Sequence, residues 1–317
     1  MKKLLITRAL PEATLAAARA RFDVTLRTET TGLTVAEAAA ALRDYDAILP
    51  TLGDGFAAAA FTGAIRCGVL ANFGVGYNHI DVAAARAAGV CVSNTPDAVT
   101  DATADIGMTL ILSACRRAGE GERLVRAGQW TGWQPTQMLG THVTGKTVGI
   151  VGMGRIGQAV ARRCLYGFNM PVLYFNRSPK MVDMPAQQVD SLHDLMGRAD
   201  IIVVTVPGGG SNTGLIDAAA LAAMKPNGIF VNIARGDVVD EDALIAALQK
   251  RQIAGAGLDV FAKEPIVPDA LRALENVVIL PHLGTAALEV REAMGQMALD
   301  NIIAWDEGRA LPQGLTS

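Results

Sequence analysis

The sequence predicts an α/β protein built from two doubly wound parallel sheets. Short apolar runs alternate with helical stretches through the first hundred residues, and the same alternation resumes after a glycine-rich turn that starts at Gly152. Alternating β and α segments favour parallel sheets with helices on both faces. The chain has 317 residues, of which 50% are hydrophobic, so it is long enough to form two separate cores.

The first hundred residues are expected to form the first sheet. The expected strands are residues 4–7, 47–49, 69–72 and 90–93, and the expected helices are residues 11–21, 35–42 and 82–88. In such sheets ligands bind at the carboxyl ends of the strands, where Leu52 and the loop 72–78 follow their strands. Gly74 and Gly76 flank Val75 in this loop, so consecutive backbone N–H groups could converge on an anion such as a carboxylate. An ordinary turn between strand and helix is the alternative.

The segment 147–180 has the pattern of a strand, a glycine turn and a helix. An apolar run at 148–151 stops at Gly152, and a helix is expected over 156–164. Gly152 permits the tight turn, Gly154 lets backbone N–H groups approach a pyrophosphate, and Gly157 lets the helix pack against the strand. Because another apolar run follows at 172–175, the distance fits a βαβ unit and predicts a Rossmann dinucleotide-binding domain.

The rest of the chain predicts a second sheet and two crossings between domains. Strands are expected at residues 201–206, 229–233, 254–258 and 277–280, with helices from 192, at 218–224 and at 241–250. One long helix is expected over 101–128, after a turn at 94–97. Another is expected over 285–307 and should return to the first domain, because a terminal helix of that length needs an apolar surface to cover. We therefore expect a discontinuous N-terminal domain, residues 1–99 and 287–317, with a Rossmann NAD(P)-binding domain at 100–286.

Composition excludes several classes of function. The net charge of -3 and the absence of a Lys/Arg run argue against a nucleic-acid partner. No apolar run approaches the roughly 18 residues of a membrane span, and the first ten residues are too short for a signal-peptide core. The cysteines show no CxxC spacing, so we expect buried thiols, no disulfide, no metal and a cytoplasmic location. These cysteines are Cys67, Cys91, Cys115 and Cys164.

Polar residues follow the expected strands of the second half. Arg235, Asp259 and His282 each come shortly after a strand, and Glu264 lies five residues after Asp259. The carboxyl ends of parallel strands meet at one edge of a sheet, so we expect these side chains to gather beside the dinucleotide. Taken singly, each could equally be a solvated turn residue or, for His282, a satisfied core histidine.

Together these segments resemble the D-specific 2-hydroxyacid dehydrogenases over nearly the whole chain. The resemblance lies in GMGRIG at 152–157, NIARGDVVDEDAL at 232–244, GAGLDVFAKEP at 255–265 and PHLGTA at 281–286, and also in NFGVGYNHID at 72–81 and SNTPDAVTDATAD at 93–105. VPGGG at 206–210, NRSPK at 176–180 and GWQPT at 132–136 are similar to the bacterial glyoxylate/hydroxypyruvate reductases. The resemblance implies NAD(P)H-dependent reduction of small 2-oxo acids to D-2-hydroxy acids, and a homodimer built on the long helix after Asp101. It also implies that the discontinuous domain, residues 1–99 and 287–317, is a flavodoxin-like substrate domain.

The resemblance also implies roles for single residues. His282 would be the general acid and base, Glu264 its carboxylate partner, and Arg235 the anchor of the substrate. Hydride transfer to a 2-oxo acid builds negative charge on the carbonyl oxygen, so a proton donor and a fixed cation are needed beside it. Backbone groups of Val75 and Gly76 would bind the substrate carboxylate. Leu52 and Trp133 would form walls of a small substrate pocket.

The cofactor contacts implied by the resemblance lie in both crossings and around the second sheet. They are Thr100, Gly152, Gly154, Arg155, Ile156, Gly157, Asn176, Arg177, Ser178, Val206, Pro207, Ile233, Ala234, Arg235, Asp259, His282 and Gly284. NAD sites usually place an acid about 20 residues after the glycines, whereas this chain has Asn176, Arg177 and Ser178 there. These residues could bind a 2′-phosphate, so NADP(H) is the preferred cofactor and NAD(H) remains an alternative.

Three other functions are compatible with parts of this pattern. The first is a non-catalytic dinucleotide-sensing regulator on the same scaffold, against which the joint presence of Arg235, Glu264 and His282 argues. The second is a reductase of larger 2-oxo acids. The third is the formate dehydrogenase branch, whose histidine pairs with glutamine, so Glu264 argues against it.

Overall fold

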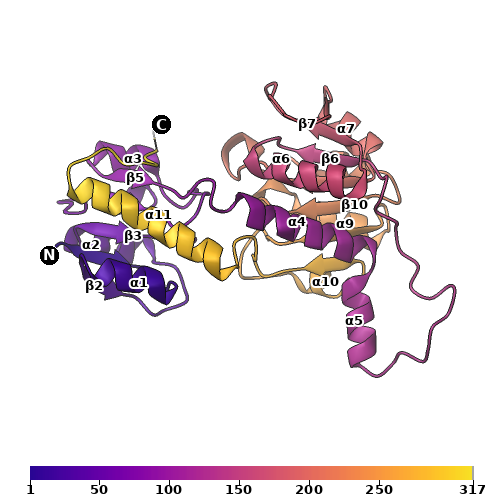
Figure 1. The fold of residues 1–317 in the computed structure, drawn as a ribbon, viewed down its shortest axis with the longest axis horizontal. Helices are drawn as coiled ribbons and strands as arrows, with labels where there is room; N and C mark the ends of the chain where they lie inside the picture. Colours follow the sequence, from indigo (N-terminus) through magenta and orange to yellow (C-terminus); the bar gives the residue numbers. More distant parts are fainter. Residues whose placement is uncertain (316–317) are drawn as a thin grey trace. The chain divides into compact units, whose positions relative to one another are not determined.

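The computed structural model describes residues 1–315 and divides into two compact units (Figure 1). Unit 1 joins Met1–Val99 to the segment that begins at Thr285, and unit 2 is Thr100–Gly284. The first division lies at the expected crossing after residue 99. The second lies after residue 284, two residues before the expected crossing after 286.

Unit 1 is a five-stranded parallel sheet with strand order β2-β1-β3-β4-β5. Its strands are β1 (Lys3–Ile6), β2 (Asp23–Leu26), β3 (Ala47–Leu49), β4 (Val69–Ala71) and β5 (Cys91–Ser93). Its helices are α1 (Glu12–Arg19), α2 (Val35–Asp44), η1 (Ala58–Ala60), α3 (Val82–Ala87) and α11 (Leu288–Asp306). The order 2-1-3-4-5 is that of flavodoxin-like sheets, which bind ligands at the carboxyl ends of their strands.

The C-terminal helix α11 covers one face of this sheet. Leu299 and Ile302 are buried in one cluster with Leu4 and Ile6 of β1. The ring of Trp305 lies so close to Gly68 that a Cβ atom there would come within 2.3 Å of it. The terminal helix therefore belongs to the N-terminal unit because its apolar face completes that core.

Unit 2 is a seven-stranded parallel sheet with strand order β12-β11-β10-β9-β6-β7-β8. Its strands are β6 (Val148–Val151), β7 (Val172–Phe175), β8 (Gln187–Gln188), β9 (Ile201–Val204), β10 (Ile229–Asn232), β11 (Gly255–Leu258) and β12 (Val277–Ile279). Numbered within the unit, the order is the Rossmann order 3-2-1-4-5-6 with one further strand. Both faces of the sheet are buried, because alternate residues such as Ile202 and Val203 enter different core clusters.

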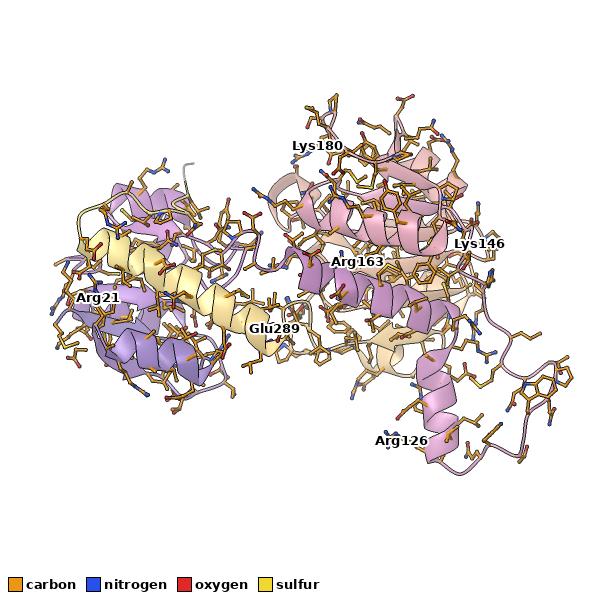
Figure 2. The ribbon with its side chains drawn as sticks, viewed as in Figure 1. Arg21, Arg126, Lys146, Arg163, Lys180 and Glu289 are labelled. Atoms are coloured by element: carbon orange, nitrogen blue, oxygen red, sulfur yellow. The ribbon has the colours of Figure 1, made fainter. Side chains whose placement is uncertain are left out.

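Unit 2 also contains helices, most of which cover a face of the sheet (Figure 1). They are α4 (Thr100–Cys115), α5 (Ala118–Arg126), α6 (Arg155–Arg162), α7 (Leu192–Arg198), α8 (Ala218–Ala222), α9 (Glu241–Gln249) and α10 (Asp269–Arg272), with short segments η2 (Arg163–Gly167), η3 (Gly210–Asn212) and η4 (Gly236–Val238). Helix α5 instead projects away from the sheet (Figure 1). Arg163, labelled in Figure 2, joins the end of α6 to α4 through ion pairs to Asp101 (3.0 Å) and Asp105 (2.8 Å). These pairs hold the first turns of α4 against α6.

The single helix expected over residues 101–128 is wrong. Arg117 takes a left-handed conformation (φ 53°) that separates α4 from α5, and Figure 1 shows the two helices running in different directions. The carbonyl of Cys115 accepts a hydrogen bond from the amide of Thr141 (2.7 Å). Since that carbonyl binds a loop instead of a helical amide, the helix ends there. The described side chains of α5 are not buried.

The expectation of four buried cysteines is also corrected. All four are free thiols, but Cys91 is exposed at the start of β5, an edge strand. Burial raises the pKa of Cys67 and Cys164 to about 12 and that of Cys115 to about 11. Sequence reasoning also missed β2, β8 and α10, whose short segments carry few apolar residues.

Residues 1–315 contain neither a membrane-spanning helix nor a cluster of metal-binding side chains. None of their helices is both long and apolar enough to span a membrane. Nor do these residues contain a group of three or more His, Cys, Asp or Glu side chains arranged to hold a metal ion.

Candidate active site

The glycine turn after β6 leaves the N-terminus of α6 open to an anion. Gly152 has φ 97°, a conformation that favours glycine, and a Cβ atom there would lie 2.6 Å from Val206. A Cβ atom at Gly157 would lie 2.2 Å from the carbonyl oxygen of Gly152, so α6 can pack against the turn only with glycine. Nothing lies within 4 Å of a Cβ atom at Gly154, and no side chain caps the helix there. The turn therefore fits a pyrophosphate.

The carboxyl end of β7 continues this candidate cofactor site. Asn176 accepts a hydrogen bond from the amide of Met153 in the glycine turn (3.2 Å) and donates one to the carbonyl of Ser178 (2.7 Å). Arg177 is exposed and donates from Nη1 to Oγ of Ser211 (2.7 Å). No acidic side chain stands at the positions 176–178, so a phosphate group would meet a guanidinium and hydroxyl groups here.

His282 and Glu264 form a hydrogen-bonded pair at the carboxyl edge of the sheet. The Nδ1 atom of His282 lies 2.8 Å from Oε2 of Glu264, and their side chains retain 29% and 27% of their exposure. Burial raises the pKa of Glu264, but the hydrogen bond and charge of His282 and the amide of Phe261 lower it more, so the net shift is downward. The carboxyl group is therefore ionised at neutral pH. It holds one imidazole nitrogen and leaves Nε2 as the nitrogen that can act on a substrate.

Asp259 fixes the turn that carries His282. Its carboxylate accepts hydrogen bonds from the amides of Leu283 (2.6 Å) and Gly284 (2.8 Å), and its carbonyl accepts one from the amide of His282 (3.0 Å). His282 has φ 54°, in the left-handed region where histidine is among the more tolerated residues. Burial raises the pKa of Asp259, against the opposing effect of the Leu283 amide and His282.

Arg235 follows β10 on the same edge as the pair. The carbonyl of Arg235 is held by Nδ2 of Asn232 (2.9 Å), and its Nη1 donates to the carbonyl of Ala234 (2.6 Å). Burial lowers the pKa of Arg235, while the carboxylates of Glu264 and Asp237 oppose the shift. Residues after β10, β11 and β12, three neighbouring strands, thus supply Arg235, Asp259 and His282.

The other predicted cofactor residues lie along the carboxyl ends of the same sheet or at helix starts. Thr100 is the first residue of α4, Arg155 and Ile156 begin α6, Val206 and Pro207 follow β9, and Ile233 and Ala234 follow β10. Gly284 is buried, and its carbonyl accepts a hydrogen bond from Thr103 (3.2 Å). The predicted contacts of unit 2 therefore follow one edge from β7 to β12.

In unit 1, the loop after β4 is held through its carbonyl groups. Asn72 donates from Nδ2 to the carbonyls of Gly74 (2.9 Å) and Gly76 (3.1 Å), and Asn94 donates to that of Val75 (2.8 Å). The amide of Thr95 also donates to Gly74 (3.1 Å). Side-chain and backbone donors thus hold the three carbonyls of this loop and fix its shape.

Leu52 lies in the loop after the neighbouring strand β3, with 41% of its surface exposed. The carbonyl of Leu52 accepts a hydrogen bond from Nη1 of Arg8 (2.6 Å), and Asp54 binds the amides of Thr51 (2.8 Å) and Leu33 (2.9 Å). The loop is thus held by groups on both sides of Leu52. Trp133, the other expected pocket wall, belongs to unit 2, where 79% of it is exposed.

Sequence reasoning missed the residues that hold these groups in place. Asn72, Arg8 and Ser211 contact the predicted residues, and Asp237 lies two residues after Arg235. Asn72 directly follows β4, and Arg8 lies two residues after β1. A position just after a strand is the same signal that identified Arg235 and His282. Ser211 gave no such signal, because its partner Arg177 is 34 residues away in the chain.

Comparisons with known proteins agree on one family. Residues 108–284 match the family described as D-isomer specific 2-hydroxyacid dehydrogenase, NAD binding domain. A glyoxylate reductase of Thermococcus kodakarensis is 42% identical over 98% of this chain and 95% of its own length. A glycerate dehydrogenase of Hyphomicrobium methylovorum is 37% identical over 96% and 95%. The crystal structure of an NADPH-dependent glyoxylate/hydroxypyruvate reductase from Sinorhizobium meliloti, with NADP and malonate, has a TM-score of 0.89 at 34% identity, over 99% and 97% of the two chains.

Proposed function

Because this chain belongs to the D-isomer specific 2-hydroxyacid dehydrogenase family, we propose that it reduces small 2-oxo acids, such as glyoxylate and hydroxypyruvate, to D-2-hydroxy acids. The observation that carries the proposal is the 2.8 Å pair of His282 and Glu264 on the strand edge that also holds Arg235. A regulator that only sensed a dinucleotide would have no need of an ionised carboxylate that orients an imidazole.

In the proposed reaction, residues of unit 2 handle the charge that forms on the substrate. A bound nicotinamide dinucleotide supplies the hydride that reaches the carbonyl carbon. Arg235 binds the carboxylate and carbonyl oxygens through its planar fork, and His282 donates a proton from Nε2 to the carbonyl oxygen. Glu264 stays ionised, fixes the tautomer at Nδ1 and stabilises the protonated imidazole.

We propose that unit 1 binds the carboxylate of the same substrate through the N–H groups of Val75 and Gly76. The support is that Asn72 and Asn94 hold the carbonyls of this loop and so fix its shape, and that consecutive N–H groups in such a loop can converge on an anion. Leu52 would contact the small side chain of the substrate. Unit 1 would thus be the substrate domain, and unit 2 the cofactor domain.

For the cofactor, we propose that NADP(H) is preferred and NAD(H) is accepted. Arg177 and Ser178 would bind the 2′-phosphate, with Ser211 holding Arg177 beside them through their 2.7 Å hydrogen bond. A hydrogen bond to a charged group contributes about 1.5–3 kcal/mol, and the exposure of Arg177 favours the lower end. The NADPH-dependent relative from Sinorhizobium meliloti agrees with this preference.

The experiment that tests the function compares substrates and cofactors in one series. Rates of NADPH and NADH oxidation are measured with glyoxylate, hydroxypyruvate, pyruvate and phenylpyruvate. We expect glyoxylate and hydroxypyruvate to give the highest kcat/KM, with NADPH ahead of NADH. A highest value for phenylpyruvate would favour the reductase of larger 2-oxo acids. Dinucleotide binding without oxidation in the whole series would favour the regulator.

We also propose that the protein is a homodimer. In unit 2, Trp130 and Trp133 expose 53% and 79% of their surface on the connection after α5, and α5 itself has no buried side chain. Large aromatic side chains are enriched at protein interfaces. Light scattering of the purified protein, and of Trp133→Ser beside it, would test the assembly; a monomeric wild type would contradict it.

A further inference from the structure

The loop after β9 packs directly on the side chain of Arg235. A Cβ atom at Gly208 would lie 2.7 Å from Cγ and 2.8 Å from Cβ of Arg235. Carbon atoms in favourable contact are about 3.5–4.0 Å apart, so a residue with a side chain does not fit at position 208 while Arg235 keeps this conformation. The contact involves the first two carbons of the arginine side chain, which cannot move aside as its far end could.

The reason for glycine differs along this loop. Gly209 (φ 75°) and Gly210 (φ 56°) have left-handed conformations that favour glycine, whereas Gly208 does not. A Cβ atom at Gly210 would meet nothing within 4 Å. Backbone conformation therefore accounts for Gly209 and Gly210, and the contact with Arg235 accounts for Gly208.

Asp237 ties the same loop to the segment that carries Arg235. Its Oδ2 atom accepts a hydrogen bond from the amide of Gly209 (2.7 Å), and its carbonyl accepts one from the amide of Gly214 (2.8 Å). Its Oδ1 atom would lie 2.7 Å from a Cβ atom at Gly208. The carboxylate thus closes the loop next to the glycine and keeps Gly208 against Arg235.

We propose that Gly208 and Asp237 are positioning residues for Arg235, which fix the direction of its guanidinium group toward the 2-oxo acid. The proposal rests on the proposed function of Arg235 as the substrate anchor. The contact with Gly208 holds Cβ and Cγ of Arg235, and the hydrogen bond from Nη1 to the carbonyl of Ala234 (2.6 Å) holds the far end, so the orientation of the planar fork is set before the substrate binds. A misplacement of about 1 Å at a reacting centre can reduce the rate by about 100-fold.

The first test substitutes alanine for two glycines of the loop. Gly208→Ala should raise KM for glyoxylate by about tenfold or more, because the guanidinium group is displaced, while kcat falls less. The dissociation constant of NADPH, measured by fluorescence titration, should stay within about twofold, since the glycine turn and Arg177, which we propose to bind its phosphates, are not substituted. Gly210→Ala is the control for strain in the loop backbone, because its φ of 56° favours glycine but its Cβ atom meets nothing within 4 Å; its KM for glyoxylate should rise less than that of Gly208→Ala.

The second test separates the hydrogen bond of Asp237 from its charge. Asp237→Asn keeps an oxygen acceptor for the Gly209 amide, whereas Asp237→Ala removes it. We expect Asp237→Ala to raise KM for glyoxylate by about tenfold, because the hydrogen bond to the Gly209 amide is lost; a tenfold change corresponds to about 1.4 kcal/mol. In Asp237→Asn most of this rise in KM should be absent. A merely structural role would lower the melting temperature without this change in KM.

A double-mutant cycle decides whether Gly208 acts through Arg235. In an Arg235→Ala background there is no guanidinium group to displace, so Gly208→Ala should cause little further loss of kcat/KM. An equal loss in both backgrounds would overturn the proposal, as would unchanged KM values in Gly208→Ala and Asp237→Ala. If Gly208→Ala does not fold, the comparison of Asp237→Ala with Asp237→Asn tests the proposal instead. A wild type that reduces no 2-oxo acid would contradict the proposed function, so failure of the proposed function can be distinguished from failure of the positioning role.

Discussion

The carboxyl edges of the two sheets are built in different ways. In unit 2 the proposed functional groups are side chains, with His282, Glu264 and Arg235 placed by the ends of β10 to β12. In unit 1 the proposed groups are the backbone amides of Val75 and Gly76, in a loop whose carbonyls are held by side chains such as Asn72. Chemistry that needs a proton requires a titratable side chain, whereas a carboxylate can be bound by N–H groups alone. The two edges should therefore respond differently to substitution.

The largest expected effect is on the side-chain edge. His282→Ala should lower kcat by about 100-fold or more, because general acid catalysis contributes roughly 10²–10⁴, while NADPH binding stays unchanged. His193→Ala, an exposed histidine of α7, is the control and should behave as the wild type. Single-turnover kinetics would check that hydride transfer is the slow step. If His282→Ala keeps a kcat near that of the wild type while hydride transfer is the slow step, His282 is not the proton donor.

On the backbone edge, the expected effect appears in KM. Asn72→Ala frees the carbonyls of Gly74 and Gly76, so the loop amides lose their orientation and KM for glyoxylate should rise by about tenfold, at about 1.4 kcal/mol. The fall in kcat should be smaller than that of His282→Ala. Asn301→Ala, which removes another buried asparagine of unit 1 that bonds Met297 and Gln313, controls for lost stability. Equal KM values in both variants would mean that Asn72 does not shape a substrate loop.

Cofactor preference is a third effect, of similar size but confined to one of the two cofactors. Arg177→Ala should raise KM for NADPH by about tenfold and leave KM for NADH almost unchanged, because only NADPH carries the 2′-phosphate. The difference should shrink at high salt, which screens an exposed charge. Arg198→Ala, whose side chain is exposed on α7 and paired with Asp194, is the control. An equal effect on both cofactors would refute phosphate binding by Arg177.

Replacing the carboxylate of the pair should shift the pH profile. The pKa of Glu264 is lowered, so the carboxylate is charged at neutral pH and stabilises the protonated imidazole. In Glu264→Gln that stabilisation is gone, and the pH at which reduction is half lost should fall. Glu241→Gln removes a carboxylate that bonds the same loop at Ala262 without reaching His282, so its profile should match the wild type. Identical profiles in all three proteins would separate Glu264 from the reaction.

The same carboxylate should have a small effect on stability. Its pKa is lower in the folded protein than the value of about 4.3 expected for the unfolded chain. It therefore contributes stability above about pH 4.3, and this contribution is lost as pH falls through the folded pKa. The difference in unfolding free energy between wild type and Glu264→Gln should narrow from pH 6 to pH 3, as measured by urea titration. A difference in unfolding free energy that widens as pH falls would contradict a lowered pKa of Glu264 in the folded protein.

The sequence by itself predicted the elements whose residues are informative locally. The glycines at 152, 154 and 157 specify a turn and a helix start, and polar residues that end apolar runs identified Arg235 and His282, because the carboxyl ends of parallel strands share an edge. The prediction of one helix over 101–128 failed, because the left-handed Arg117 and a hydrogen bond from Thr141 to Cys115 end the helix. These two hydrogen-bonded residues are 26 positions apart, so the local sequence does not reveal the contact. Cys91 was misjudged because an apolar neighbourhood does not reveal an edge strand.

What only the tertiary structure decided is which groups hold the functional residues in place. Gly208 reads as a flexible glycine in the sequence, yet it contacts Arg235, and Asp237 closes that loop. Ser211 meets Arg177 although they lie on different strand ends. Such contacts join segments 27 to 34 residues apart and depend on atoms a few ångströms from each other. Local sequence sets backbone preference and polarity, whereas close contacts between distant segments are set by how the sheet brings its strand ends together.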